Sequence, residues 1–224
     1  ICHVVLPERG HLSPGMFCVG GDSHSPTGGA FGAYMFGIGA TEMGGVLATG
    51  EIWLRVPETI LIHWNNHLGP FVTAKDMMLA VCGEIGMGGG RYQAIQYAGA
   101  AVQDLSMQER MTMSNMAAEL GAQTGLIAPD EVTESYVTAA GGSMSDDWTD
   151  YPIEVADRPE DHLRFDAAAL SPQIAAPHSP ANAADAGEFR HTAFDVAYIG
   201  ACTGAKYVDL AAAATVLKLS LIHI

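Results

Sequence analysis

The stretch Phe17-Cys-Val-Gly-Gly-Asp-Ser-His-Ser-Pro-Thr-Gly-Gly-Ala30 decides the fold that the sequence predicts. A short apolar strand runs into two glycines, which permit a sharp turn, and the turn delivers Asp22, Ser23 and His24 together. In an open α/β sheet, side chains at the carboxyl end of a strand face the ligand crevice. An acid, a hydroxyl and an imidazole there favour a proton-handling site. The same residues would also suit a capped turn before a helix, so both interpretations remain open on this stretch alone.

Composition limits the classes of function. The chain has 224 residues, of which 49% are hydrophobic, and a formal charge of -15 from 25 acids and 10 bases. Phosphate binding needs a basic surface, so we expect no nucleic-acid partner. No apolar run approaches the length of a membrane span, so we expect no membrane partner. The four cysteines form no CxxC pair, which is typical of a reducing, cytoplasmic setting.

Outward from this stretch, the pattern alternates between strands and helices and predicts an α/β protein. The predicted strands cover residues 3–6, 16–19, 51–56, 59–63 and 194–199. The predicted helical segments cover residues 30–50, 74–85, 113–120 and 208–218. The last residues, 219–224, read as a cloning or library artefact and are left out of the fold prediction.

Cys202 lies in a second turn of the same kind, between the predicted strand 194–199 and the predicted helix 208–218. A helix N-terminus stabilises a thiolate, which is the form that acts as a nucleophile or metal ligand. A lone cysteine is more often a small buried hydrophobic residue. The residues alone therefore leave both roles open for Cys202.

Several motifs occur along the chain in a characteristic order. They are Gly21-Asp-Ser-His24, the glycine-rich segment 28–39, Ala74-Lys-Asp76, the segment 115–121, Pro177-His-Ser-Pro180 and Gly200-Ala-Cys-Thr203. Together with the segment 3–8, this set resembles the aconitase superfamily over residues 3–218. The resemblance implies partial aconitase-like domains of three αβα layers. Residues 1–57 would complete a first domain, 58–187 would form a second with its linker, and 188–224 would begin a third.

The same resemblance implies a set of catalytic residues. In the family, a histidine matching His3 pairs with the aspartate that matches Asp22. The histidine that matches His24 pairs with a glutamate matching Glu119, and the residue matching Ser23 contacts the substrate. Pairing with a carboxylate fixes the tautomer of an imidazole and raises its basicity. Without the resemblance, His3 would be an ordinary strand residue and Glu119 an exposed helical acid.

The resemblance further implies a [4Fe-4S] cluster. Cys202 would supply the first of three cysteine ligands, with Asn115 beside the cluster. The other two cysteines would come from a downstream part of the large subunit that this sequence does not contain. Such a site leaves one iron open as a Lewis acid for a small hydroxy acid. The base that removes the carbon-bound proton would be a serine of a separate swivelling domain or small subunit. Because two cluster ligands are missing, the fragment alone is expected to be inactive and to bind no stable cluster.

Departures from the family pattern indicate the branch. The usual Cys-Thr-Asn-Gly-Arg reads Cys202-Thr-Gly-Ala-Lys206, and a frequent glutamate is Gln96. With these changes the sequence most resembles a divergent branch near the isopropylmalate dehydratase large subunits. These are hydro-lyases of leucine biosynthesis that act on a hydroxy-dicarboxylic acid. The aconitase, homoaconitase and dimethylmalate dehydratase branches remain alternatives. A further alternative is a non-enzymatic α/β protein whose glycine-rich turns bind a phosphate or nucleotide, although neither a Walker nor a Rossmann spacing occurs.

Overall fold

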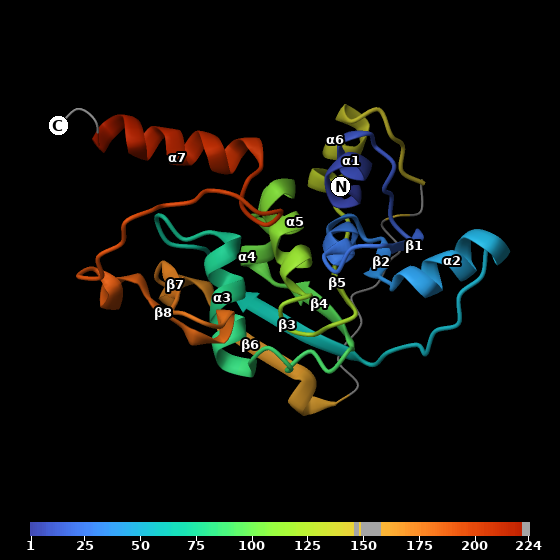
Figure 1. The fold of residues 1–224 in the computed structure, drawn as a ribbon, viewed down its shortest axis with the longest axis horizontal. Helices are drawn as coiled ribbons and strands as arrows, with labels where there is room; N and C mark the ends of the chain where they lie inside the picture. The colour runs from blue at the N-terminus through green and yellow to red at the C-terminus, as the bar shows by residue number, and fades with distance from the viewer. Residues whose placement is uncertain (146–147, 149–157, 221–224) are drawn as a thin grey trace.

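Two parallel sheets organise the computed structural model, which describes residues 1–145, 148 and 158–220 (Figure 1). The smaller sheet pairs β1 (Phe17–Gly20) with β2 (Tyr34–Gly37). The 3-10 helix η1 (Ser25–Phe31) connects these strands, and all seven of its residues are buried. The segment 17–30 therefore makes a strand, a turn and a buried crossover, and the predicted α/β class is confirmed.

The larger sheet has the strand order β5-β4-β3-β6, with all neighbours parallel. Its strands are β3 (Thr59–Asn65), β4 (Ala94–Ala98), β5 (Thr124–Ile127) and β6 (His162–Asp166). The helix α3 (Ala74–Ile85) links β3 to β4, and α4 (Ala100–Gln103) and α5 (Met107–Met116) link β4 to β5. Every residue of β4 is buried, as expected for a central strand of a parallel sheet.

The main core lies between this sheet and the helices α3 and α5. Met77 and Met78 of α3 are fully buried against it, so the methionine stripe is core. Trp64 at the end of β3 stacks on Phe165 of β6, with ring centroids 4.6 Å apart. The helix α3 ends at Gly86, whose φ of 73° lies in the left-handed region that glycine tolerates.

The smaller sheet packs against the β5 edge of the larger one through η1. The backbone of Gly29 approaches so closely that a β-carbon there would lie 1.9 Å from the carbonyl oxygen of Gly125. The Thr124 hydroxyl donates a hydrogen bond to the carbonyl of Met35 at 2.8 Å. These contacts fix the position of η1, and with it the turn at residues 21–24, against α5 and β5.

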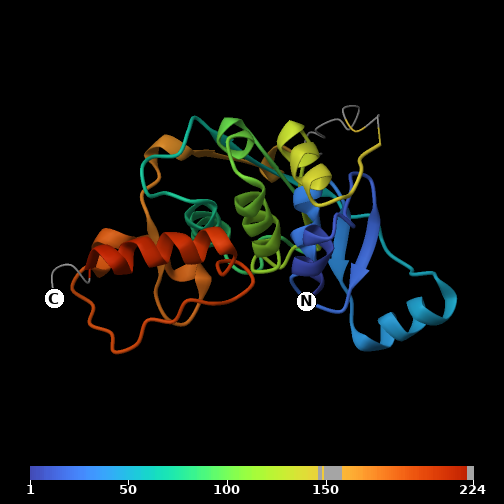
Figure 2. The same cartoon turned by 90° about the horizontal axis from the view of Figure 1, so that it is seen from above.

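The remaining elements surround this frame (Figures 1 and 2). The helix α6 (Glu131–Ala139) lies beside α1 (Cys2–Glu8). The helix α2 (Ala40–Thr49) extends away from the rest, and none of its residues is buried. The strands β7 (Gln173–Ala175) and β8 (Ala183–Asp185) form an antiparallel pair near α3, and short 3-10 turns flank them.

The chain ends in α7 (Tyr207–Ser220), which follows an extended segment and the turn that carries Cys202. Within the described residues, no helix is both long enough and apolar enough to span a membrane. Of the segment 219–224 that we assigned to an artefact, residues 221–224 lie outside the described part of the chain.

Four sequence predictions of local structure are wrong. Residues 3–6 belong to the helix α1 rather than to a strand. The helix predicted over 30–50 is divided into β2 and α2, because Gly32 turns the chain with a φ of 70°. Residues 51–56 form no strand. Residues 194–199 form no strand either, and three of their apolar side chains are at least 77% exposed, because no described strand pairs with them.

Other predictions hold closely. The helix 74–85 is found with the predicted bounds, and β3 and α7 cover the segments expected of them. The helix predicted over 113–120 is displaced toward the N-terminus. It begins at Met107, because the side chain of Ser106 caps it by accepting a bond from the amide of Glu109, and it ends at Met116.

Candidate active site

The turn after β1 is built from tightly packed backbone. Asp22 Oδ1 accepts the backbone N–H of His24 at 2.8 Å, and the carbonyl of Asp22 accepts the Ser25 hydroxyl at 2.7 Å. A β-carbon on Gly20 would lie 2.1 Å from the Ser25 oxygen, so a larger residue there would displace the Ser25 side chain from its bond to Asp22. Asp22 thus braces the turn through one carboxylate oxygen.

His24 points from this turn toward Glu119, which follows the end of α5. Its Nε2 lies 3.2 Å from Oε1 of Glu119, and its Nδ1 lies 3.2 Å from the Ser23 hydroxyl. Both side chains of the His24–Glu119 pair are partly exposed, at 25% and 31%. The ring therefore has a polar partner at each nitrogen and remains accessible to a small molecule.

His3 lies behind the same turn, on α1. Its Nδ1 is 3.6 Å from Asp22 Oδ1, an ion-pair distance that is too long for a good hydrogen bond. Burial lowers the pKa of His3 below 6.5, although the carboxylate of Asp22 acts in the opposite direction. Its Nε2 is buried and has no partner among the described residues. His3 therefore lies beside Asp22 with burial favouring its neutral form and with one ring nitrogen unpartnered among the described residues.

Asn115 of α5 joins this region to the turn that carries Cys202. Its amide nitrogen donates to the Thr27 hydroxyl at 2.9 Å and to the Sγ of Cys202 at 3.3 Å. The Thr27 hydroxyl in turn donates to the carbonyl of His24 at 2.7 Å. A continuous hydrogen-bonded path thus connects the two turns across α5.

A cavity of about 410 Å³ opens beside this path, and both His3 and Cys202 line it. Lys206, Tyr136 and Met111 also contribute to its wall. The thiol-bearing turn and the histidine behind the acid–imidazole turn therefore face one space. Of the seven predicted site residues, His3 and Cys202 line this cavity, and the other five are linked to these two by the contacts described above rather than by lining the same space.

Sequence reasoning missed three polar residues of this region. Thr27 and Thr112 supply hydroxyls that connect α5 to the two turns, and Lys206 inserts its ammonium beside Thr203. Thr27 lies three positions after His24, and this short spacing was the available signal. Nothing in the sequence alone pairs Thr112 with Lys206, which lies 94 positions later.

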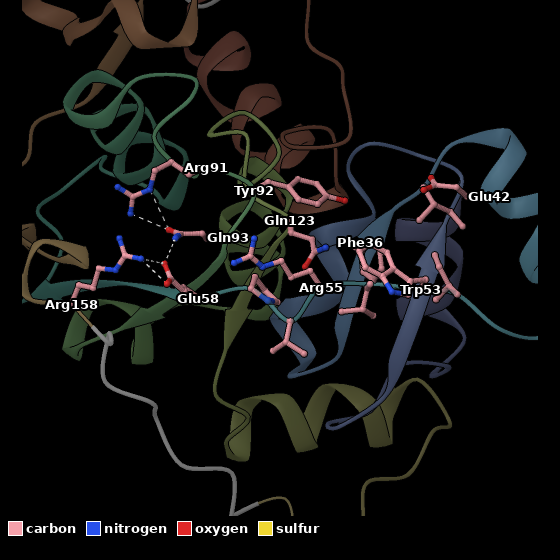
Figure 3. Close-up of a pocket in the computed structure, with 15 residues that line it drawn as sticks. Phe36, Glu42, Trp53, Arg55, Glu58, Arg91, Tyr92, Gln93, Gln123 and Arg158 are labelled. Atoms are coloured by element: carbon pink, nitrogen blue, oxygen red, sulfur yellow. Dashed lines mark hydrogen bonds and ion pairs between the residues drawn. The ribbon is translucent and has the colours of Figure 1, made fainter.

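A second cavity, of about 480 Å³, lies elsewhere and contains none of the predicted site residues. Figure 3 shows its charged wall, where Arg158 binds both oxygens of Glu58 at 2.6 and 2.7 Å. Gln93 donates to Glu58 and accepts from Arg91, so these polar groups satisfy one another. This network is best described as structural support at the start of β3 and β4.

Comparison with known proteins shows the family of this chain. The model of the aconitase family (aconitate hydratase) matches residues 1–191. The chain belongs to the aconitase family. Within the family, it is 45% identical to 3-isopropylmalate dehydratase large subunit 1 of Methanopyrus kandleri, over 100% of this chain and 53% of that protein.

Other relatives in the aconitase family show a similar coverage. The 3-isopropylmalate dehydratase large subunit of Moorella thermoacetica is 40% identical over 99% of this chain and 52% of that protein. A probable methanogen homoaconitase large subunit of Methanosarcina mazei is 41% identical over 97% of this chain and 55% of that protein. The chain thus spans about half the length of the curated relatives it matches.

Proposed function

We propose that this chain is part of the large subunit of an aconitase-type hydro-lyase that dehydrates and rehydrates a hydroxy-dicarboxylic acid. The observation that carries the proposal is the pairing of His24 with Glu119 at one end of α5 and of Asn115 with Cys202 beside it. Relatives named 3-isopropylmalate dehydratase favour isopropylmalate as the substrate and leucine biosynthesis as the pathway. The relative named homoaconitase supports a second branch of the same chemistry.

The chain's own residues suit proton transfer at a hydroxyl group. With Nε2 paired to Glu119, His24 can carry a second proton on Nδ1 and pass it to a departing hydroxyl. Ser23 lies beside Nδ1 and is available to bind the substrate. His3 and Asp22 form the second proposed pair, in which the buried imidazole lies 3.6 Å from the carboxylate. The proposed catalytic residues are therefore His3, Asp22, His24 and Glu119.

Cys202 fits one ligand position of a [4Fe-4S] cluster. It is a free, half-buried thiol whose Sγ accepts a hydrogen bond from Asn115, the kind of contact that tunes a cluster thiolate. Among the described residues, no group of three or more His, Cys, Asp or Glu side chains could hold a metal. The other two thiolates would therefore come from the part of the relatives' length that this chain does not cover. When bound, such a cluster supplies a Lewis-acidic iron for the substrate hydroxyl.

The proposal extends to organisation and partners. We assign residues 1–57, 58–187 and 188–224 to three successive domains, of which the third is only begun here. A small subunit would complete the active site, as the relatives' designation as large subunits suggests. We place the enzyme in the cytoplasm because its cysteines are free and unpaired among the described residues.

Turnover by the complete large subunit with its small subunit tests this function. Isopropylmalate, homocitrate, citrate and dimethylmalate would be supplied separately, and the unsaturated product would be followed by its ultraviolet absorbance. We expect isopropylmalate to give the highest kcat/KM and Asp22→Asn to reduce it strongly. The proposal is wrong if none of the four acids is dehydrated and a nucleotide binds instead in calorimetry.

A further inference from the structure

Lys206 makes contacts that the proposed reaction does not use. Its ammonium Nζ donates to the hydroxyl of Thr112 at 2.9 Å and to the carbonyl of Thr203 at 3.0 Å. The Thr112 hydroxyl donates its own proton to that same carbonyl at 2.8 Å. The three groups form a triangle in which the hydroxyl accepts from the ammonium and can donate to the Thr203 carbonyl, which is nearer than its alternative acceptor, the Gln108 carbonyl at 3.2 Å.

This triangle holds the backbone next to Cys202. Thr112 and Asn115 lie three positions apart on α5 and so share one face of the helix. Thr112 holds Thr203, and Asn115 contacts the Sγ of Cys202. Two neighbouring residues of the turn are therefore fixed to two neighbouring side chains of one helix.

The turn has few other restraints. In the part of the chain that the structure describes, no backbone–backbone hydrogen bond involves residues 193–205. Ala201 has a φ of 73°, a left-handed conformation that costs a residue with a β-carbon about 1 kcal/mol. Side-chain hydrogen bonds therefore hold this turn in place.

Lys206 is suited to this task by its surroundings. The side chain is half-buried, and hydrogen bonds from a partly desolvated ammonium are stronger than those between neutral groups. Its backbone N–H donates to Asp209 Oδ2 at 3.0 Å, which also fixes the start of α7. Of the three lysines in the sequence, Lys218 is exposed at the far end of the same helix.

We propose that Lys206 is a positioning residue that clamps the Cys202 turn onto α5 through Thr112 and thereby holds Sγ beside Asn115. The clamp itself does not depend on the proposed hydro-lyase function. Its consequence, a thiolate held in place to receive a cluster, rests on that function. This positioning role differs from a purely electrostatic one, in which the charge of Lys206 alone would act on the Cys202 thiol.

Hydrogen exchange of the Lys206 amide in the full chain tests the clamp, because within 199–206 this is the amide with an acceptor among the described residues, Oδ2 of Asp209. Lys206→Met and Thr112→Val each break the triangle, and we expect exchange of this amide to accelerate by roughly tenfold, the scale for losing a hydrogen bond to a charged group. Thr112→Ser keeps the hydroxyl and should restore slow exchange. Lys218→Met removes a lysine from the same helix and serves as the matched control.

Alkylation of Cys202 by neutral iodoacetamide, followed by peptide mass spectrometry, separates positioning from charge. Loss of a favourable charge in Lys206→Met would slow the reaction, whereas release of the turn would accelerate it severalfold. Thr112→Val retains the ammonium, so its acceleration reports release alone, and the double variant should add little to either single change. Exchange and alkylation no different from those of Lys218→Met would overturn the proposal. If Lys206→Met does not fold, the comparison of Thr112→Val with Thr112→Ser decides it.

Discussion

Nε2 of His24 lies 3.2 Å from Oε1 of Glu119, although the two residues are 95 positions apart in the chain. The contact joins the turn after β1 to the residues that follow α5, and it depends on the close packing of η1 against β5. A carboxylate at Nε2 stabilises the protonated ring and fixes its orientation. The pair therefore combines a structural link with a group that can move a proton.

We expect Glu119→Gln to lower kcat of the complete enzyme by about 100-fold, the usual scale for a general acid or its orienting partner. The amide keeps the shape of the side chain but cannot stabilise an imidazolium. Glu84→Gln is the matched control, since Glu84 is an exposed acid on α3. Equal kcat values for the two variants would show that Glu119 has no catalytic role. Equal melting temperatures would show that a lower kcat of Glu119→Gln does not come from unfolding.

The sequence predicted those parts of the fold that depend on local pattern. The helix 74–85 follows from its apolar spacing and its stop at Gly86. The apolar residues Val4 and Val5 suggested a strand, but they lie in a helix that packs onto η1. Residues 194–199 have a strand-like pattern, yet a strand needs a neighbouring strand, which local pattern cannot supply.

The site was predicted to a different degree. Asp22, Ser23 and His24 could be grouped from adjacency alone, since they share one turn. The partnership of His24 with Glu119 came from family resemblance, because no spacing rule links residues so far apart. The Lys206–Thr112 contact was not predicted at all, since it depends on where the 200–206 turn meets α5.

A buried arginine gives a sharp prediction of stability. The side chain of Arg110 is fully buried, binds both oxygens of Asp130 at 2.7 Å and donates to two backbone carbonyls. Arg110→Met should reduce the free energy of unfolding by about 3–5 kcal/mol, because the carboxylate and the carbonyls lose their donor. Urea unfolding measures the change, with the exposed Arg9→Met as the control. A loss below about 1 kcal/mol would contradict this account.

The same pair predicts a pH dependence. Burial would raise the pKa of Asp130, but the hydrogen bonds and charge of Arg110 outweigh it, so the pKa lies below 3.8. A carboxyl whose pKa is lower in the folded state contributes stability above its unfolded pKa and loses it as the pH falls through the folded value. Stability should therefore decline below about pH 4, and Asp130→Asn should flatten that decline. If Asp130→Asn loses stability with falling pH as steeply as the unaltered protein, Asp130 is not the source of the pH dependence.

Two glycines should respond to alanine in opposite directions. At Gly29 a β-carbon would lie 1.9 Å from a backbone oxygen of β5, so Gly29→Ala must separate η1 from that strand. At Gly45, in the middle of exposed α2, a β-carbon would meet nothing within 4 Å, and alanine favours the helix. We expect Gly45→Ala to raise stability by about 0.5–1 kcal/mol and Gly29→Ala to lower it by more than that. Thermal unfolding of both variants measures these changes. An unchanged melting temperature of Gly29→Ala would contradict the close packing of η1 on β5.

The distribution of thiols predicts how the chain and the complete protein differ in metal content. The described residues supply one suitably placed thiol, Cys202, whereas Cys82 is fully buried and burial raises its pKa to about 11. After anaerobic reconstitution with iron and sulfide, we expect this chain alone to retain no stable [4Fe-4S] cluster, because one thiolate cannot replace three. In the complete protein, Cys202→Ser should abolish or severely weaken the cluster, while Cys18→Ser should leave it intact. Iron and sulfide analysis measures both, and a stoichiometric cluster on the chain alone would show that Cys202 has partners other than those expected downstream.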